Sequence, residues 1–496
     1  LRPVVAGNEP APDVDPVLSS GAMKLRRKKL DNLPWDHSGR HPGSPLFWHL
    51  IMQMMRIAWR YIFRSRQVDD PPIHNGGRIF SSIHINGLVD PMSLLLSQDR
   101  KVISMGRHDL MTMPLIGWFS RRMGSQPVIR RPEILLGVAD EDYARKINQR
   151  SLLTMTNCIA AGHNAVVMPE GKSHQDSRLH RFKTGTMRFG INAAAIASMK
   201  GIDPPAIQPV GLHYRRHYWF RTDVFVEFGD PLLIETPEDS DHGPKLVSGE
   251  WVEPPHKQVN SLRDQLFQSL SELTPNAPDW TTYRAWHLLA HVHANQVGDS
   301  LSSFKDEVIA ARRVREMIFN GDIPEEIIEP SSQAAEILHS HDLDGRSITD
   351  SGISTSRNWL SLMFALPLML ISAPITIIST GPQALLARFL GDRTDEGVDA
   401  RTTYHMLAAM FSPVLFWPPI ATALALSAFG VSYLLIPATI IAMISFHLSN
   451  LIFLFGYDNW VDFADSKRRR ALSSSRDGAK LEELISEAKK LLNLSK

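Results

Sequence analysis

The chain has 496 residues, very little cysteine and almost no net charge. Its single cysteine, Cys158, excludes disulfides within the chain, iron–sulfur clusters and zinc sites built from cysteine. Lys and Arg total 53 against 52 Asp and Glu, and the resulting formal net charge of +1 argues against a general nucleic-acid binder. With 43% hydrophobic and 21% charged residues, the composition also excludes a collagen-like or wholly disordered chain.

Charge is missing altogether from two long stretches towards the C-terminus. Residues 358–380 and 402–457 contain no Asp, Glu, Lys or Arg. Because a helix needs about 20 apolar residues to cross a bilayer, the first stretch is long enough for one crossing and the second for two, with a turn near residues 427–430. Prolines in both stretches leave kinked or re-entrant segments open. We therefore predict a membrane region of two or three segments over residues 351–460.

The small net charge hides an uneven distribution along the chain. Residues 1–66 hold eleven basic and five acidic residues, whereas residues 231–350 hold nine basic and twenty-one acidic ones. We predict a flexible basic arm over residues 1–45, an amphipathic interfacial helix over 46–66 and an acidic helical extension over 236–350.

Basic residues also flank the membrane region. Arg56, Arg60 and Arg64 recur on one face of the predicted interfacial helix, where they can meet lipid phosphates; a solvated arginine stripe on a helix packed against the protein is the alternative. A basic and amphipathic helical tail is predicted over residues 461–496, and its basic cluster at 467–470 favours the cytoplasmic side. We expect an integral membrane protein with its globular part on the cytoplasmic face.

An alternating pattern precedes the acidic extension. Short apolar runs such as RIFSSI and VFVEFG alternate with helical patterns such as TGTMRFGINAAAIASM. This alternation predicts an α/β domain over residues 67–235, with a mixed sheet flanked by helices.

The first motif with candidate catalytic residues is HINGLVDP, which begins at His84 and contains Asp90. It lies between a strand-like run and a helical pattern, and such an elbow can bring the carboxylate back to the imidazole. A carboxylate bonded to one ring nitrogen fixes the tautomer and leaves the other nitrogen as a general base. Taken alone, a loop histidine and an aspartate at a helix N-cap are usually structural.

Two further motifs follow in the chain. MPEGKS contains Glu170 and Gly171 directly after a strand-like run, and such a turn offers a carboxylate for a substrate hydroxyl and a close backbone approach. GSQPVIRR contains Arg130, which suits bidentate recognition of phosphate. Each of the two, considered separately, is an ordinary turn or a surface arginine.

Together, in their order and spacing along the chain, the three motifs resemble the PlsC-like glycerolipid acyltransferase superfamily. HINGLVDP and PEGKSHQDSRLHRFKTG are similar to the fungal-type glycerol-3-phosphate/dihydroxyacetone-phosphate acyltransferases and their bacterial relatives. Met168 stands where the family has Phe, and the His-to-Asp spacing is one residue longer than the commonest one. The likeness covers residues 76–286 and is followed by late membrane segments, as in that branch.

The resemblance implies a glycerolipid O-acyltransferase with acyl-CoA, or an acyl carrier protein, as co-substrate and no metal or other cofactor. His84 would take the proton of the acceptor hydroxyl while Asp90 orients it. Glu170 would hold the acceptor, with backbone donors near Gly171 stabilising the oxyanion. Arg130 would bind the phosphate. Further phosphate candidates are Lys183, Arg188 and Arg221.

The acceptor stays open at this point. Glycerol 3-phosphate is the first expectation, lysophosphatidate is the alternative, and a non-catalytic membrane scaffold on the same fold is a third possibility. The partners expected are a lipid bilayer, the acyl donor and a phosphorylated glycerol, and no nucleic acid. His287 and His291 share a helix face at a spacing that can bind zinc, but without a third ligand they favour a structural role.

Overall fold

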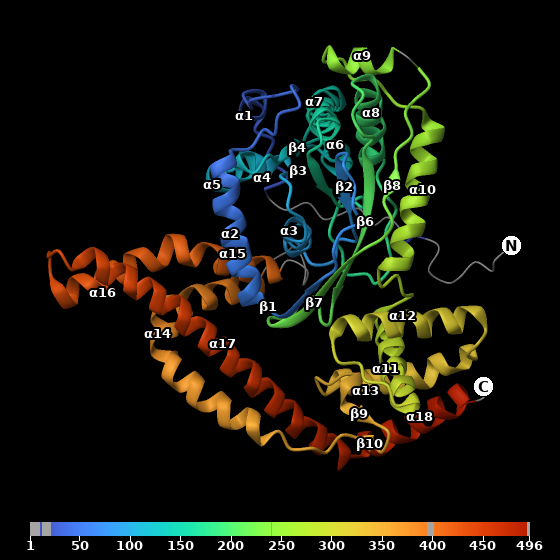
Figure 1. The fold of residues 1–496 in the computed structure, drawn as a ribbon, viewed down its shortest axis with the longest axis vertical. Helices are drawn as coiled ribbons and strands as arrows, with labels where there is room; N and C mark the ends of the chain where they lie inside the picture. Colours follow the sequence, from blue (N-terminus) through green and yellow to red (C-terminus); the bar gives the residue numbers. More distant parts are fainter. Residues whose placement is uncertain (1–9, 12–20, 240, 394–400, 494–496) are drawn as a thin grey trace.

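The structure, a computed structural model, describes residues 10–11, 21–239, 241–393 and 401–493. Its central feature is an eight-stranded mixed sheet in the order β1-β7-β6-β2-β5-β3-β4, with β8 beside β6 (Figure 1). The predicted α/β fold with a mixed sheet flanked by helices is confirmed. The strands are β1 (Phe63–Val68), β2 (Arg78–Ser81), β3 (Val102–Arg107), β4 (Gln126–Val128), β5 (Asn164–Val167), β6 (Ala206–Tyr214), β7 (Thr222–Phe228) and β8 (Leu232–Leu233).

Strand direction decides where a site can form. Strands β2, β3, β4, β5 and β6 are mutually parallel, whereas β7 and β8 run antiparallel to β6 and β1 runs parallel to β7. Five strands therefore end at the same edge of the sheet, which is where open α/β sheets place their ligands. The residues that follow β2, β4 and β5 include His84, Arg130 and Glu170, so the topology brings the three sequence motifs to one edge.

Helices cover the sheet and supply its hydrophobic core. The helices of this part are α1 (Arg27–Asp31), α2 (Pro45–Ile62), α3 (Val89–Leu96), α4 (His108–Thr112), α5 (Pro114–Arg122), α6 (Arg131–Leu135), α7 (Glu141–Ala160), α8 (Gly185–Met199), α9 (His242–Val247) and α10 (His256–Leu273). Apolar side chains of α10, including Leu266 and Leu270, belong to the same core as the sheet. The domain therefore extends beyond the predicted boundary at residue 235, because α10 packs on β6.

The predicted helix over residues 46–66 ends earlier than expected. Helix α2 stops at Ile62, and Phe63 begins strand β1. Its apolar face, with Trp48 and Ile51, is buried in the domain core, while Arg56 and Arg60 are exposed. This is the packed helix with an arginine stripe that stood as the alternative. Contact of these arginines with lipid stays a prediction.

The basic arm is only partly within the described residues, since 1–9 and 12–20 lie outside them. In the rest of the arm, Leu30 of α1 is fully buried and packs with Ile129, Ala144 and Ile147. Ala11 pairs with His180 in an isolated parallel bridge. This part of the arm is packed on the domain, because its apolar side chains find partners there, and it is not the flexible segment that we predicted.

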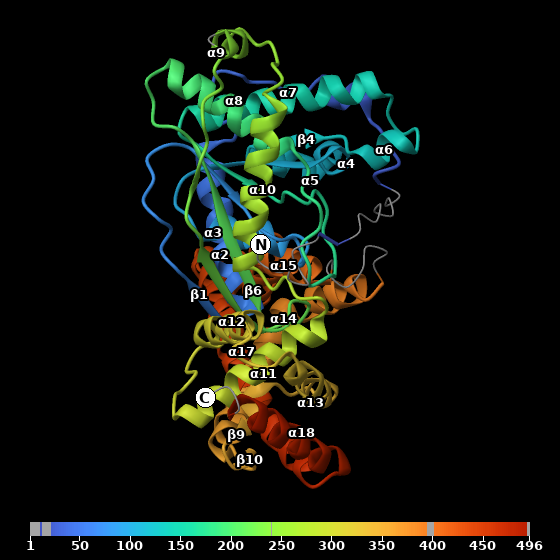
Figure 2. The same ribbon diagram turned by 90° about the vertical axis from the view of Figure 1, so that its right-hand side faces the viewer.

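The acidic extension forms a second helical unit with its own hydrophobic cluster. Figures 1 and 2 show its helices below the sheet, together with the C-terminal helix α18. The C-terminal helix thus returns to the extension, where Leu481 and Ile485 are buried. The elements are α11 (Trp280–Val297), α12 (Phe304–Asn320), η1 (Glu325–Ile327), α13 (Ile328–Ser340), η2 (Gly345–Ser347), β9 (Ile348–Thr349), β10 (Gly352–Ile353) and α18 (Arg476–Asn493).

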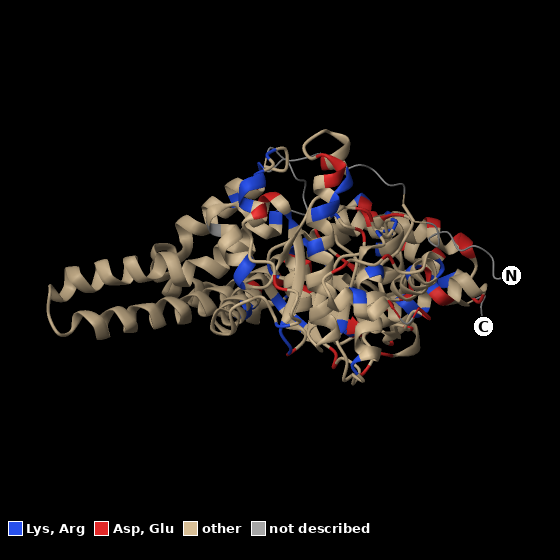
Figure 3. Ribbon diagram, turned by 90° about the horizontal axis from the view of Figure 1, so that it is seen from above, with Lys and Arg blue, Asp and Glu red and all other residues tan. Residues whose placement is uncertain are grey.

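The two uncharged stretches form long helices. They are α14 (Trp359–Gly391), α15 (Arg401–Phe411), the π-helical turn η4 (Ser412–Phe416), α16 (Trp417–Phe429) and α17 (Leu435–Ser473). Within the described residues, three helical stretches are long and apolar enough to cross a membrane: Trp359–Gly391, Arg401–Phe429 and Leu435–Ser473. The expected turn lies at Gly430, which has a φ of 59°. In Figure 3 the hairpin of α16 and α17 projects from the body without charged residues.

The second uncharged stretch does not begin as a lipid-exposed segment. Its first helix, α15, packs against α2 and α3, and Met406 and Met410 are buried in the core of the domain. The part of this stretch whose apolar side chains are mostly exposed therefore starts further along the chain, near α16. The polar second half of α17 is also bound to the domain, since Asp462 pairs with Arg64 at 2.7 Å and Asp458 pairs with Arg221.

Candidate active site

His84 and Asp90 form a hydrogen-bonded pair just after strand β2. His84 Nδ1 lies 3.0 Å from Asp90 Oδ2. A carboxylate can only accept, so the proton of the neutral ring is on Nδ1, and Nε2 is the nitrogen left to act as a base. The imidazole is 19% exposed, whereas the Asp90 side chain is fully buried. The structure therefore brings the two predicted residues together in the geometry that a general base requires.

Four hydrogen-bond donors, including His84 Nδ1, hold the Asp90 carboxylate. Its Oδ2 also accepts hydrogen bonds from the backbone N–H groups of Ile85 and Asn86, both at 2.7 Å. Its Oδ1 accepts from the hydroxyl of Tyr214, the last residue of β6, at 2.8 Å. Helix α3 starts at Val89, so Asp90 lies in its first turn rather than at the N-cap that we predicted. From the first turn of α3 the carboxylate binds back to His84, Ile85 and Asn86 and so holds the loop between β2 and α3.

Tyr214 was not among the predicted site residues. Burial and the charge of Asp90 raise the pKa of Tyr214 far above its ordinary value, so its hydroxyl stays protonated and donates. A tyrosine at the end of an apolar strand carries no local signal for such a role. Only the pairing of β6 with β2 brings it to this edge of the sheet.

The Glu170 carboxylate binds two backbone N–H groups of the site. Its Oε2 accepts a hydrogen bond from the backbone N–H of His84 at 2.9 Å, and its Oε1 accepts from the backbone N–H of His180 at 2.8 Å. The side chain is fully buried. Glu170 is therefore occupied by the protein itself and positions His84. The expected contact of Glu170 with the acceptor stays a prediction.

His174 completes this support. Its backbone N–H donates to the His84 carbonyl at 3.0 Å, and its Nε2 lies 3.0 Å from Glu170 Oε1. Burial alone would lower the pKa of His174, but the negative charges of Glu170, Asp176 and Asp90 outweigh it and the pKa is raised. Both backbone groups of His84 are thus held by the segment that follows β5. In the sequence, His174 belongs to the SHQD run. The supporting role of that run becomes visible only through the contacts of His174 with His84 and Glu170.

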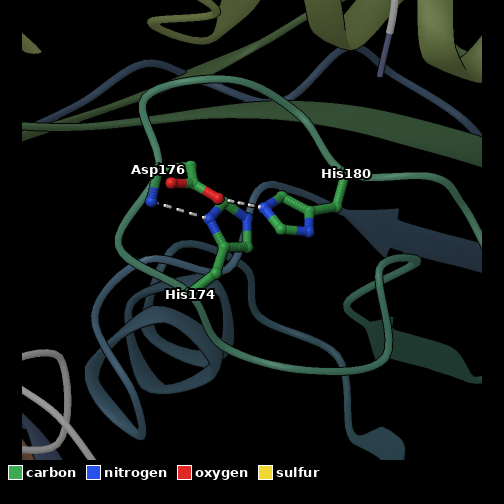
Figure 4. A group of neighbouring side chains, drawn as sticks. All are labelled: His174, Asp176 and His180. Atoms are coloured by element: carbon green, nitrogen blue, oxygen red, sulfur yellow. Dashed lines mark hydrogen bonds and ion pairs between the residues drawn. The ribbon is translucent and has the colours of Figure 1, made fainter. Parts of the chain in front are cut away.

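His174, Asp176 and His180 also qualify by distance as metal ligands, since their donor atoms lie within 4.8 Å of one another (Figure 4). The two imidazole rings, however, are stacked with centroids 4.0 Å apart and planes 25° apart. Lone pairs in nearly parallel rings point side by side and do not converge on one ion. His180 Nε2 instead bonds to Asp176 Oδ2 at 2.6 Å. The arrangement therefore fits a hydrogen-bonded support better than a metal centre.

Gly171 and Lys183 lie together at the turn after β5. Gly171 has a φ of 75°, a conformation that favours glycine. Its N–H donates to the carbonyl of Met168 at 3.0 Å, so this backbone donor belongs to the turn and not to an oxyanion site. The N–H of Lys183 donates to the Pro169 carbonyl at 2.7 Å, which holds Lys183 beside the turn.

Arg130 follows β4 at the same edge of the sheet. Its Nε and Nη2 donate to Oε1 of Glu133 at 2.9 and 2.6 Å. Glu133 is fully buried, so this bidentate contact fixes the direction of the guanidinium. The position is compatible with the predicted phosphate contact.

Arg188 and Arg221 have other partners. Arg188 pairs with Glu253 and lies over the ring of Trp251. Arg221 pairs with Asp458 of α17 and donates to the carbonyl oxygen of Phe63 at 2.7 Å. Both side chains are paired with carboxylates of the same chain, as Arg130 is, and their predicted phosphate contacts stay predictions.

Comparisons with known proteins show what this domain is similar to. Residues 64–213 match the family model named Acyltransferase. Glycerol-3-phosphate O-acyltransferase 2 of Saccharomyces cerevisiae is 29% identical over 152 residues, which are 30% of this chain and 19% of the yeast protein. Glycerol-3-phosphate O-acyltransferase 1 of the same yeast is 23% identical over 324 residues, 59% of this chain and 40% of that protein. The chain therefore matches less than half the length of either relative.

A solved structure is also similar: the crystal structure of the 1-acyl-sn-glycerophosphate (LPA) acyltransferase, PlsC, from Thermotoga maritima. It shares 15% identity and a TM-score of 0.29, and the match covers 44% of this chain and 79% of that one.

The family model and the two yeast relatives define the class of this domain. The chain carries an acyltransferase domain over residues 64–213, with the His84–Asp90 pair at the carboxyl edge of its sheet. The resemblance to PlsC-like glycerolipid acyltransferases, which the three sequence motifs indicated, is confirmed.

Proposed function

We propose that this chain is a membrane-bound acyltransferase that moves a fatty acyl group from acyl-CoA, or from an acyl carrier protein, to a hydroxyl of glycerol 3-phosphate in phospholipid biosynthesis. The observation that carries the proposal is the His84–Asp90 pair, with its 3.0 Å contact, inside a domain of the acyltransferase family. The two yeast relatives named as glycerol-3-phosphate O-acyltransferases support the acceptor.

The geometry supports a direct transfer. Nε2 of His84 takes the proton of the acceptor hydroxyl as its oxygen attacks the thioester carbonyl, while the Asp90 carboxylate stabilises the imidazolium. The tetrahedral intermediate then expels the thiolate, which takes the proton from His84. The new ester and the free thiol leave the site. Since the acceptor hydroxyl is the nucleophile, no acyl-enzyme forms.

Two of the basic residues that the sequence indicated are our first candidates for phosphate recognition. Arg130 and Lys183 both lie at the carboxyl edge of the sheet, on the segments after β4 and β5. They are our proposed contacts for the acceptor phosphate. Arg188 and Arg221 lie in ion pairs with Glu253 and Asp458 and stay secondary candidates for this role.

We further propose that the apolar helices insert into a lipid bilayer with the catalytic domain on the cytoplasmic face. The exposed apolar side chains of α14, α16 and α17 support insertion, because such surfaces are unfavourable in water. The basic cluster at residues 467–470 supports the orientation.

The test is an acceptor panel with the purified full-length protein: glycerol 3-phosphate, dihydroxyacetone phosphate and lysophosphatidate, each with acyl-CoA and with acyl carrier protein. His84→Ala is expected to lower kcat about 10²–10⁴-fold, as loss of a general base does. His256→Ala, at an exposed histidine at the start of α10, is the matched control and keeps full activity.

Transfer to lysophosphatidate alone would replace the acceptor. Equal activity of His84→Ala and the native protein would refute the proposed base. A protein that binds lipid but transfers no acyl group to any acceptor would favour the scaffold reading.

A further inference from the structure

The first helix of the hairpin region, α15, contacts the catalytic loop directly. The hydroxyl of Thr402 donates to Oδ1 of Asn86, two residues after His84. The backbone N–H of Leu88 donates to Oγ1 of Thr403 at 3.0 Å. Two consecutive residues of α15 thus bind the loop between His84 and Asp90, more than 300 residues earlier in the chain.

These contacts lie next to the groups that fix the catalytic pair. Asn86 is fully buried, and its N–H donates to Asp90 Oδ2 at 2.7 Å. Its carbonyl accepts from the N–H of Val89 at 3.0 Å, which closes the turn into α3. Thr402 therefore holds the side chain of the residue whose backbone binds the Asp90 carboxylate. Loss of this hydroxyl would leave a buried amide oxygen without its donor, which is unfavourable.

Helix α15 is itself firmly attached to the domain. Met406 is fully buried and Met410 is 3% exposed, and both belong to the core that the sheet shares with α2 and α3. Phe411 meets Phe119 of α5 edge to face, with ring centroids 5.3 Å apart. The chain then continues through η4 into α16, the first helix of the apolar hairpin. One continuous segment therefore connects the catalytic loop to the membrane-facing helices.

We propose that Thr402 and Thr403 are positioning residues that hold the His84–Asp90 loop in its reactive geometry, so that the helix leading into the apolar hairpin completes the support of the active site. The inference rests on the proposed acyl transfer at His84. Neither threonine touches the reacting atoms. They act through Asn86 and Leu88, and a loop displacement of about 1 Å can lower a rate by about 10²-fold.

The kinetic test compares Thr402→Val, Thr403→Val and the double variant with the native protein. We expect kcat to fall about 10-fold for Thr402→Val and further for the double variant, with KM for the acceptor unchanged. Thr402→Ser keeps the hydroxyl and is expected to restore kcat. Thr439→Val is the matched control, because the Thr439 hydroxyl donates to Leu435 within its own helix, at 2.9 Å, in the same apolar region.

A second measurement is independent of activity. The N–H groups of Ile85, Asn86, Leu88 and Val89 are all hydrogen-bonded within the loop or to α15, so hydrogen exchange reports directly on its order. We expect faster exchange in a peptide covering residues 84–90 for Thr402→Val and Thr403→Val, and unchanged exchange for Thr439→Val.

The two measurements separate the possible failures. An inactive native protein whose loop exchange still responds to the threonine variants would refute the proposed function and leave the structural coupling standing. An active native protein with unchanged kcat and unchanged exchange in both variants would overturn the coupling. A fall in kcat that Thr402→Ser does not restore would also overturn it, because the hydroxyl would not be the cause.

Discussion

At the residue scale, the site contains two carboxylates that bind backbone and side-chain donors of the protein itself. Asp90 accepts from one imidazole, one hydroxyl and two backbone N–H groups. Glu170 accepts from the backbone N–H groups of His84 and His180. Hydrogen bonds to charged acceptors are stronger than neutral ones, so both carboxylates can hold a short loop against thermal motion.

This arrangement leads to a prediction for Glu170→Gln. A glutamine has a single carbonyl oxygen, so one of the two backbone N–H groups loses its acceptor and faces an amide donor instead. We expect kcat to fall at least about 10-fold and stability to fall by about 1–3 kcal/mol, with KM for glycerol 3-phosphate little changed. Steady-state kinetics and a thermal unfolding curve measure these effects.

Glu253→Gln is the control for this variant, because Glu253 pairs with Arg188 away from the catalytic loop. It should keep the native kcat. A large rise in KM with unchanged kcat for Glu170→Gln would restore the acceptor-binding role that the sequence alone indicated.

At the element scale, the turn between β6 and β7 attaches α17 to the domain. Arg221 in this turn has a φ of 60°, which directs its side chain to Asp458 and to backbone carbonyls of the α2–β1 junction. Its side chain is 9% exposed and that of Asp458 is 11% exposed. The neighbouring Arg64–Asp462 pair joins the same two parts but is about one-third exposed. The two pairs therefore allow a direct comparison of burial.

We predict that Arg221→Ala destabilises the protein by about 3–5 kcal/mol, since it leaves a buried carboxylate without its partner. Arg64→Ala is the matched control and should cost about 0–1 kcal/mol, because water screens an exposed pair. Chemical unfolding in one detergent measures both. Equal losses for the two variants would contradict the docking role of Arg221.

At the scale of the whole molecule, one chain joins an α/β domain, an acidic helical extension and an apolar hairpin. The lone Cys158 lies in α7 and is fully buried, and burial raises the pKa of its thiol to about 12. The thiol of the native protein should therefore react very slowly with thiol reagents at neutral pH. This makes it a suitable background for a single introduced cysteine.

Val431, at the tip of the hairpin, is 90% exposed in the absence of lipid. In sealed vesicles with the catalytic domain outside, we predict that Val431→Cys is protected from an impermeant maleimide and becomes reactive after detergent is added. Ser302→Cys, at an exposed position of the extension, is the control and should react in both conditions. Equal labelling of the two cysteines in sealed vesicles would show that the hairpin is not inserted.

Local patterns of sequence were enough to indicate much of this architecture. The absence of charge over residues 358–380 and 402–457 predicted the apolar helices, and the alternation of apolar runs and helical patterns predicted the mixed sheet. Such properties are local, because helix and strand periodicity and bilayer length are set by neighbouring residues. The same holds for the pairing of His84 with Asp90, six residues apart on one elbow.

What the tertiary structure decided is which polar group meets which. The sequence offered Glu170, Arg188 and Arg221 as substrate ligands, and only the structure shows that Glu170 binds backbone groups and that both arginines lie in ion pairs. Tyr214 and Thr402 carried no local signal, yet strand order and the docking of α15 bring them to the catalytic loop. The sequence by itself determined which reactive groups are available: the imidazole of His84, a carboxylate six residues later, and apolar stretches long enough to cross a membrane. Only long-range packing decided which groups position that histidine, because a hydrogen bond depends on distances between segments that are far apart in the chain.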